Sequence, residues 1–277
     1  MDNVPYDFVS KSRTLLMPPD ASDGERFQKT IQQLASIWGF PEDKKFYLDI
    51  ALYSVNNDEI QFRCSYYNAG NLKQIPSSSE YAANELHVYT TPMLQMSERS
   101  VLDQQNYVNL ANLLKKTETP VTYAVNESRT MTAKLHSLLS LAPRVADFSY
   151  GHDSQGNITD GAWLPPYLCT ALVRGALYYA EVSFLMLTED LVTKFLTFTD
   201  SCNFKVLRVG VSESSPITYD LFLEKIAKKA MNLLENGNDI MFCVDSAHFD
   251  QYKKLFGDRL TGFYVCEMNS VHLINGE

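Results

Sequence analysis

Residues 179–211 read YAEVSFLMLTEDLVTKFLTFTDSCNFKVLRVGV, and this stretch decides the predicted fold. It begins with the β-branched and aromatic run Tyr179–Leu187 and ends with a second such run, Lys205–Val211. Between them, residues 188–198 open with Thr-Glu-Asp, a typical helix start, and continue with an amphipathic pattern. The order strand, helix, strand predicts a parallel crossover unit.

The same rhythm continues on both sides of this unit. Short apolar runs are separated by steps of 24, 37, 24, 34 and 23 residues, and they begin near Val121, Val145, Val182, Val206, Ile240 and Phe263. Each step leaves room for one crossover helix, so the sequence predicts a parallel α/β repeat array from about residue 105 onward. The alternative is a doubly wound sheet that holds a small molecule in one crevice, which a reversal of strand order would reveal.

Alternation within three predicted strands gives each of them one apolar and one polar face. The apolar positions are Ala146, Phe148, Tyr150, Val182, Phe184, Met186, Leu207, Val209 and Val211. Helices on both faces would require continuously apolar strands, whereas a leucine-rich-repeat-like array has helices on one face only. We therefore predict a bare sheet face that binds another protein through Asp147, Ser149, Glu181, Ser183 and Arg208.

Upstream of the array, the sequence predicts a small helical and β-hairpin module. Residues 1–44 form a helical segment, residues 45–104 a hairpin-containing region with a linker, and residues 105–277 the α/β repeat-like domain. Within the second region, Lys45–Tyr67 alternates as two strands would, and residues 56–58, Asn-Asn-Asp, suit the turn between them. The polar, serine-rich segment Leu72–Ala82 is the predicted linker.

Composition argues against several classes of partner. The chain has 277 residues, is 45% hydrophobic and carries a formal charge of −9, and no basic run is longer than two residues. Nucleic acids and anionic membranes need concentrated positive charge, so neither is an expected partner. The chain has no run of 18 apolar residues, and its N-terminus lacks a basic region followed by an apolar core, which predicts a cytoplasmic protein. Its five dispersed cysteines suit free thiols.

A search for chemical motifs predicts no catalytic residue, no metal site and no cofactor. The chain lacks G-x-G-x-x-G, G-x-x-x-x-G-K-[ST], G-x-S-x-G and H-E-x-x-H. Its five histidines are never at metal-ligand spacing from one another. The loop of residues 151–161 has three possible calcium ligands, Asp153, Asn157 and Asp160, but not the pattern of a calcium loop, so we predict a surface loop beside the contact row.

One strand end keeps an enzymatic alternative open. Residues 243–248 read Cys-Val-Asp-Ser-Ala-His and follow the predicted strand that begins at Ile240. Cys243 and His248 could act as nucleophile and base in an α/β enzyme or small-ligand-binding protein, if the fold brings them within hydrogen-bond reach. The simpler interpretation is that Asp245 or Ser246 caps the following helix and that Cys243 is a core residue.

The first residues, MDNVPYDFV, resemble the start of the nematode-expanded group of F-box and F-box-associated-like proteins. In that group an F-box helix module precedes an α/β or leucine-rich-repeat-like region that recognises substrates, a layout that covers most of this chain. The resemblance implies that a Skp1-type adaptor of a ubiquitin ligase contacts Val4, Pro5, Phe8 and Trp38.

Residues 1–44 have a second interpretation. Ser10, Lys11, Ser12 and the acidic stretch Asp20–Glu25 stand where an F-box would present apolar helix positions to its adaptor. Because an adaptor groove needs a continuous apolar anchor row, the alternative is a helical cap over one end of the array. In either case the preferred hypothesis is a non-enzymatic, intracellular protein-binding module.

Overall fold

The computed structural model describes a large part of the chain, namely residues 46–55, 59–66, 69–90, 98–117, 120–127, 131–152, 163–173, 177, 179–199, 206–212, 214–235, 240–243, 251, 254–255, 263–265 and 269–273. The chain divides into two compact units. The first comprises residues 1–123 and 131–146, and the second comprises residues 124–130 and 147–277. The division falls within the strands β6 (Val121–Glu127) and β7 (Val145–His152).

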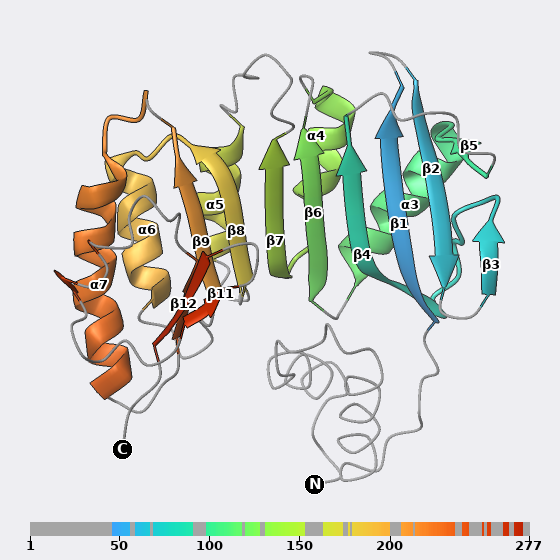
Figure 1. The fold of residues 1–277 in the computed structure, drawn as a ribbon. Helices are drawn as coiled ribbons and strands as arrows, with labels where there is room; N and C mark the ends of the chain where they lie inside the picture. The colour runs from blue at the N-terminus through green and yellow to red at the C-terminus, as the bar shows by residue number, and fades with distance from the viewer. Residues whose placement is uncertain are drawn as a thin grey trace, which may run out of the picture. The chain divides into compact units, whose positions relative to one another are not determined.

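The first unit is built around β1 (Phe46–Ser54), which pairs antiparallel with β2 (Ile60–Tyr66) and parallel with β4 (Tyr81–Tyr89). The antiparallel pair confirms the predicted hairpin, with Ser54 opposite Ile60. Two short strands, β3 (Ala69–Leu72) and β5 (Ser100–Val101), both pair antiparallel with β2 (Figure 1).

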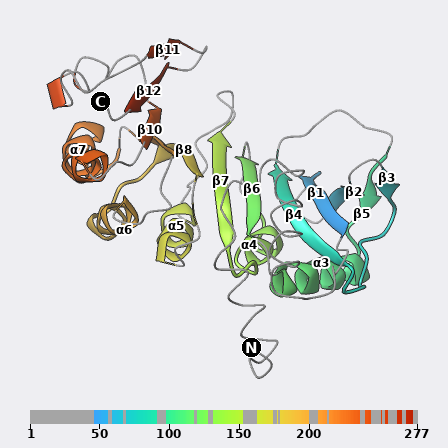
Figure 2. The same ribbon diagram turned by 90° about the horizontal axis from the view of Figure 1, so that it is seen from below.

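The described part of the first unit also contains two helices, α3 (Gln104–Lys116) and α4 (Ala133–Leu139). Figure 2 shows α3 on one side of β1, β2 and β4. The alternating residues Leu48, Ile50 and Leu52 of β1 are fully buried, as expected for strand side chains that face a helix. Asp103 is the N-cap of α3, and its side chain accepts a hydrogen bond from the Asn106 backbone N–H at 2.8 Å.

The second unit alternates strands with helices. After β7 come α5 (Leu164–Val173), β8 (Tyr179–Leu185), α6 (Glu189–Thr199), β9 (Val206–Val211), α7 (Tyr219–Glu235) and β10 (Ile240–Cys243). β7, β8, β9 and β10 lie side by side in sequence order, and each is parallel to the next. The predicted parallel α/β structure is therefore confirmed for this part of the chain.

The predicted strand faces are largely confirmed by burial. Phe148, Val182 and Leu207 are at most 3% exposed, and the Phe148 ring lies 4.9 Å from that of Tyr167 on α5. Figure 2 shows α5, α6 and α7 together on one side of these strands. Within the described part of the second unit, the polar strand face is therefore turned away from the helices.

One face assignment was wrong. The alternation in the sequence predicts that Met186 lies on the apolar face. In the structure Met186 is 40% exposed, while Leu185 is fully buried. The pairing of β8 with β9 shifts between Val182 and Leu185, so the simple alternation of faces fails after that point.

The last predicted strand also differs from the expectation. Residues 263–274 were expected to continue the parallel array, but they contain two strands, β11 (Phe263–Val265) and β12 (Asn269–Leu273), which pair antiparallel. β12 in turn pairs antiparallel with β10. Three residues separate β11 from β12, too few for the crossover that parallel neighbours require.

Candidate functional site

The five predicted partner-binding residues lie on the polar face of the second unit. Asp147 and Ser149 come from β7, Glu181 and Ser183 from β8, and Arg208 from β9. Ser149 is the register partner of Glu181, and Glu181 is the partner of Arg208, so these three form a row across adjacent strands. All five are partly exposed. We call these five residues the contact row.

Within the contact row, Glu181 pairs with Arg208 and is also bound by Tyr179. Its Oε1 atom lies 2.5 Å from Nη1 of Arg208, and its Oε2 accepts a hydrogen bond from the Tyr179 hydroxyl at 2.6 Å. Arg208 is 32% exposed and Glu181 26%. Because both oxygens of the carboxylate are engaged, these charged side chains are fixed before any partner arrives.

Other predicted sites lie wholly or partly outside the described residues. The adaptor-contact residues Val4, Pro5, Phe8 and Trp38 do so, as do residues 244–250 and 153–162. Cys243 is the register partner of Arg208, which places it beside the contact row in the backbone ladder. The hypothesis that Cys243 and His248 form a catalytic pair therefore stays a prediction.

Sequence reasoning missed a buried carboxylate in the second unit. Glu127, at the end of β6, is 1% exposed. Its Oε2 accepts hydrogen bonds from the Tyr150 hydroxyl at 2.9 Å and from Trp163 Nε1 at 3.2 Å. A buried polar group needs hydrogen-bond partners, and these two bonds fix the end of β7 to the start of α5.

Sequence reasoning also missed a polar face in the first unit. Glu85, His87 and Tyr89 alternate along β4, and in register they face Asp49, Ala51 and Tyr53 of β1. The register shift between Leu48 and Asp49 leaves Asn84 as an extra residue, and its side chain donates to Asp49 Oδ1 at 3.0 Å. The sequence contained a signal for this face. Glu85, His87 and Tyr89 are spaced two residues apart, so in a strand their side chains lie on the same side.

The two carboxylates of this face are perturbed in opposite directions. Burial raises the pKa of Asp49, an effect that the Asn84 hydrogen bond opposes and the charge of Glu85 reinforces. The pKa of Glu85 is lowered by its hydrogen bond from His87, whose Nε2 lies 2.9 Å from Glu85 Oε2. Two neighbouring carboxylates whose pKa values differ can serve as acid and base. Here both side chains are partly exposed.

Aromatic rings extend this polar face in a stack. The guanidinium carbon of Arg99 lies 3.7 Å from the ring centroid of Tyr53. Tyr53 stacks on Tyr89 with centroids 5.2 Å apart, and Tyr89 stacks on His87 at 6.2 Å. Because the ring faces stack on one another and on the guanidinium, little of their area is left for contact with a ligand.

Cys64 and Cys169 are not activated nucleophiles. Burial raises the pKa of the Cys64 thiol to about 12. Burial and the hydrogen bond to Asp190 raise the pKa of Cys169 to about 11. Both remain protonated at neutral pH, and a thiol reacts far more slowly than a thiolate.

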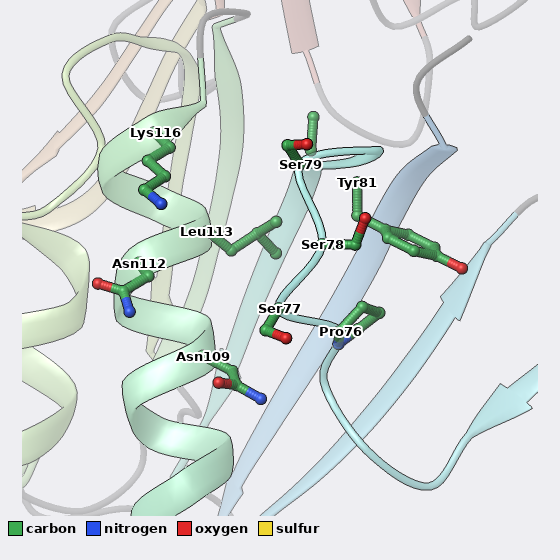
Figure 3. A pocket seen from close by; sticks show the side chains of 10 residues that line it. Pro76, Ser77, Ser78, Ser79, Tyr81, Asn109, Asn112, Leu113 and Lys116 are labelled. Atoms are coloured by element: carbon green, nitrogen blue, oxygen red, sulfur yellow. The ribbon is translucent and has the colours of Figure 1, made fainter.

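A cavity of about 370 Å³ opens in the first unit between α3 and the serine-rich segment before β4 (Figure 3). Its lining residues are Pro76, Ser77, Ser78, Ser79, Tyr81, Ala82, Asn109, Asn112, Leu113 and Lys116. In the sequence the serine-rich segment looked like a linker. In the structure it instead forms one wall of this cavity.

Two asparagines hold that wall against α3. Ile75 is 1% exposed, and its backbone N–H donates to Asn106 Oδ1 at 2.8 Å. Its carbonyl accepts from Asn109 Nδ2, also at 2.8 Å. Further along, the Thr117 hydroxyl accepts from Ala83 N–H at 3.1 Å. The serine-rich segment is thus attached to the helix on both sides of the cavity.

Two general features of the described residues bear on function. They contain no group of three or more His, Cys, Asp or Glu side chains placed to hold a metal ion. Within the same part of the chain, no helix is long and apolar enough to cross a membrane.

Comparisons of the chain with protein-family models, with curated proteins and with solved structures gave no match.

Proposed function

We propose that this protein is a protein-binding module whose second unit is a leucine-rich-repeat-like α/β array and binds its partner on the contact row. The observation that carries the proposal is the pairing of Glu181 with Arg208 on the strand face turned away from α5, α6 and α7. In a doubly wound sheet both faces would be covered by helices. A strand face that is turned away from these helices and carries fixed charges is suited to a specific protein surface.

The charges of the contact row select the chemistry of the partner. Asp147 and Glu181 contribute two carboxylates and Arg208 contributes one guanidinium, so the row is net negative. The Glu181–Arg208 pair is satisfied internally. We infer a partner surface whose positive charge complements this net negative row, with polar groups over the internal ion pair.

The N-terminal resemblance extends this proposal. If Val4, Pro5, Phe8 and Trp38 bind a Skp1-type adaptor, the contact row becomes the substrate-recognition surface of a ubiquitin-ligase-type complex. Removal of residues 1–44 would then abolish adaptor binding and leave partner binding by the contact row intact. Co-purification with the adaptor measures the first effect and partner capture the second.

An exchange of two charges tests the role of the contact row. The double variant Glu181→Arg/Arg208→Glu keeps an ion pair at the same register position and inverts the charge pattern that a partner meets. Its matched control is Glu224→Lys/Lys228→Glu, two exposed positions one turn apart on α7. Quantitative affinity capture from native lysate compares the two variants with the unmodified chain.

The proposal expects a set of partners that is lost with the contact-row variant and retained with the α7 variant. Thermal unfolding of both variants checks that the fold is kept. Equal partner sets for all three proteins would contradict the proposal, and so would equal losses in the two variants.

A further inference from the structure

The cavity beside α3 contains several polar side chains that the fold does not use. Among the described residues, the side chains of Ser77, Ser79, Asn112 and Lys116 make no hydrogen bond or ion pair. Ser78 Oγ accepts a hydrogen bond from Glu80 N–H at 3.2 Å, which leaves its own O–H free to donate. These side chains are exposed and line one cavity, so they are available to hydrogen-bond a ligand there.

These groups come from two opposite walls. Asn112 and Lys116 belong to the last two turns of α3, and the serines belong to the facing segment (Figure 3). Leu113 and Ala82, both buried, supply apolar surface between the walls. A ligand in this cavity would meet serine hydroxyls on one side, the Lys116 ammonium on the other and apolar contacts between them.

The charge of the lining favours an anion. Lys116 is the charged side chain among the described lining residues, and none of those residues is a carboxylate. The C-terminal end of a helix disfavours an anion by about 0.3–1 kcal/mol. A direct charge-assisted hydrogen bond from a lysine contributes about 1.5–3 kcal/mol, so the contribution of Lys116 is the larger one.

The number and arrangement of donors favour a phosphoryl group over a carboxylate. A phosphate monoester has three terminal oxygens that point in different directions, and lysine binds phosphate as a point charge. The hydroxyls of Ser77 and Ser79 and the ammonium of Lys116 line the same cavity and can serve as donors to such oxygens. A planar carboxylate is better matched by the fork of an arginine, which this lining lacks.

The cavity is also organised before a ligand binds. Asn106 and Asn109 fix both backbone groups of Ile75, and Thr117 fixes Ala83 at the other end. The wall that carries the serines is therefore already in position, which lowers the entropy lost on binding. We propose that this cavity binds a small phosphate monoester, with Lys116 and the serine hydroxyls around the phosphoryl group and the rest of the ligand on Leu113.

Two variants of neighbouring lysines test this site. Lys116→Gln removes the charge that lines the cavity, whereas Lys115→Gln removes the same charge from an exposed residue of the same turn that does not line it. Both variants change the net charge of the chain equally, so nonspecific electrostatic effects cancel. The probe is sn-glycerol 3-phosphate, titrated calorimetrically into the full chain at constant ionic strength, with glycerol as the uncharged comparison.

The proposal expects saturable binding of glycerol 3-phosphate that Lys116→Gln weakens by at least about tenfold and Lys115→Gln changes by less than about twofold. Ser77→Ala/Ser79→Ala, which removes two side chains without structural hydrogen bonds, should weaken binding and leave thermal unfolding unchanged. Absence of saturable binding at millimolar ligand would overturn the proposal. Equal losses in the two lysine variants, or equal binding of glycerol, would overturn it as well.

Discussion

Glu181 and Arg208 are register partners on β8 and β9, and their side chains meet with Oε1 2.5 Å from Nη1. The backbone pairing and the ion pair therefore coincide at one position of the sheet. Because Tyr179 donates to the other oxygen of Glu181, this carboxylate has a defined orientation. A partner would meet a fixed pattern of charge here, which costs less entropy to recognise than mobile side chains do.

This ion pair should contribute little to stability. Both side chains are about a quarter to a third exposed, and exposed pairs contribute about 0.2–1 kcal/mol. A double-mutant cycle of Glu181→Ala and Arg208→Ala should give a coupling energy of about 1 kcal/mol or less, measured by urea unfolding. A coupling energy well above this value would show that the pair is structural, and would weaken its assignment to binding.

The hydrogen bonds that attach the serine-rich segment to α3 should contribute strongly to the free energy of unfolding. Asn106→Ala leaves the buried Ile75 N–H without its acceptor, so we expect a loss of about 1–3 kcal/mol in the free energy of unfolding. Asn112→Ala is the control, because Asn112 is exposed on the same helix and its side chain makes no hydrogen bond in the described structure. That variant should change stability by less than about 0.5 kcal/mol. Equal effects would contradict the attachment.

The carboxylates of the first unit should show opposite pH dependence. The folded-state pKa of Asp49 is raised, so its destabilising effect develops as pH rises above the ordinary aspartate pKa. Asp49→Asn should therefore match the unmodified chain at low pH and be more stable at neutral pH. The folded-state pKa of Glu85 is lowered, so Glu85→Gln should match at low pH and be less stable at neutral pH.

Denaturant unfolding at a series of pH values measures both effects. Two differences of the same sign at neutral pH would contradict the opposite perturbation of these neighbouring groups. Differences that persist unchanged to low pH would point to packing and not to ionisation.

The hydrogen bond between Tyr150 and Glu127 should contribute strongly to the free energy of unfolding because both side chains are buried. Tyr150→Phe removes one donor from the Glu127 carboxylate, and the expected loss of stability is about 1.5–3 kcal/mol. Tyr107→Phe is the matched control, since its hydroxyl bonds to Ser137 Oγ at the surface and its loss should cost less than about 1 kcal/mol. Thermal and urea unfolding compare the two variants. A smaller effect at Tyr150 than at Tyr107 would contradict this account.

Much of the fold could be predicted from the sequence because its pattern is local. The alternation in Lys45–Tyr67 predicts a hairpin, and β1 and β2 form one. Glu181 is partly exposed and its neighbour Val182 is buried, as expected for a strand covered by helices on one side. The face predicted for Met186 was wrong because the register of β8 shifts against β9. Such a shift depends on the pairing between strands, which alternation along one strand does not reveal.

The cavity and the polar face of the first unit could not be predicted in the same way. Ile75 and Asn106 are 31 residues apart in the chain, and no local pattern joins a serine-rich segment to a later helix. Asp49 and Glu85 likewise meet through strand pairing and a register shift. The sequence did contain the alternation Glu85, His87, Tyr89, which identifies one half of that face.

Site-specific photo-crosslinking at Ser149 tests the central claim most directly. Ser149 is the register partner of Glu181 and is partly exposed, so a photoreactive residue there lies in the contact row. The same residue placed at Lys228 on α7 is the control. We predict a protein adduct at Ser149 that is absent at Lys228 and is lost in the Glu181→Arg/Arg208→Glu background. Identical adducts at both positions, or an adduct at Lys228 alone, would contradict partner binding by the contact row.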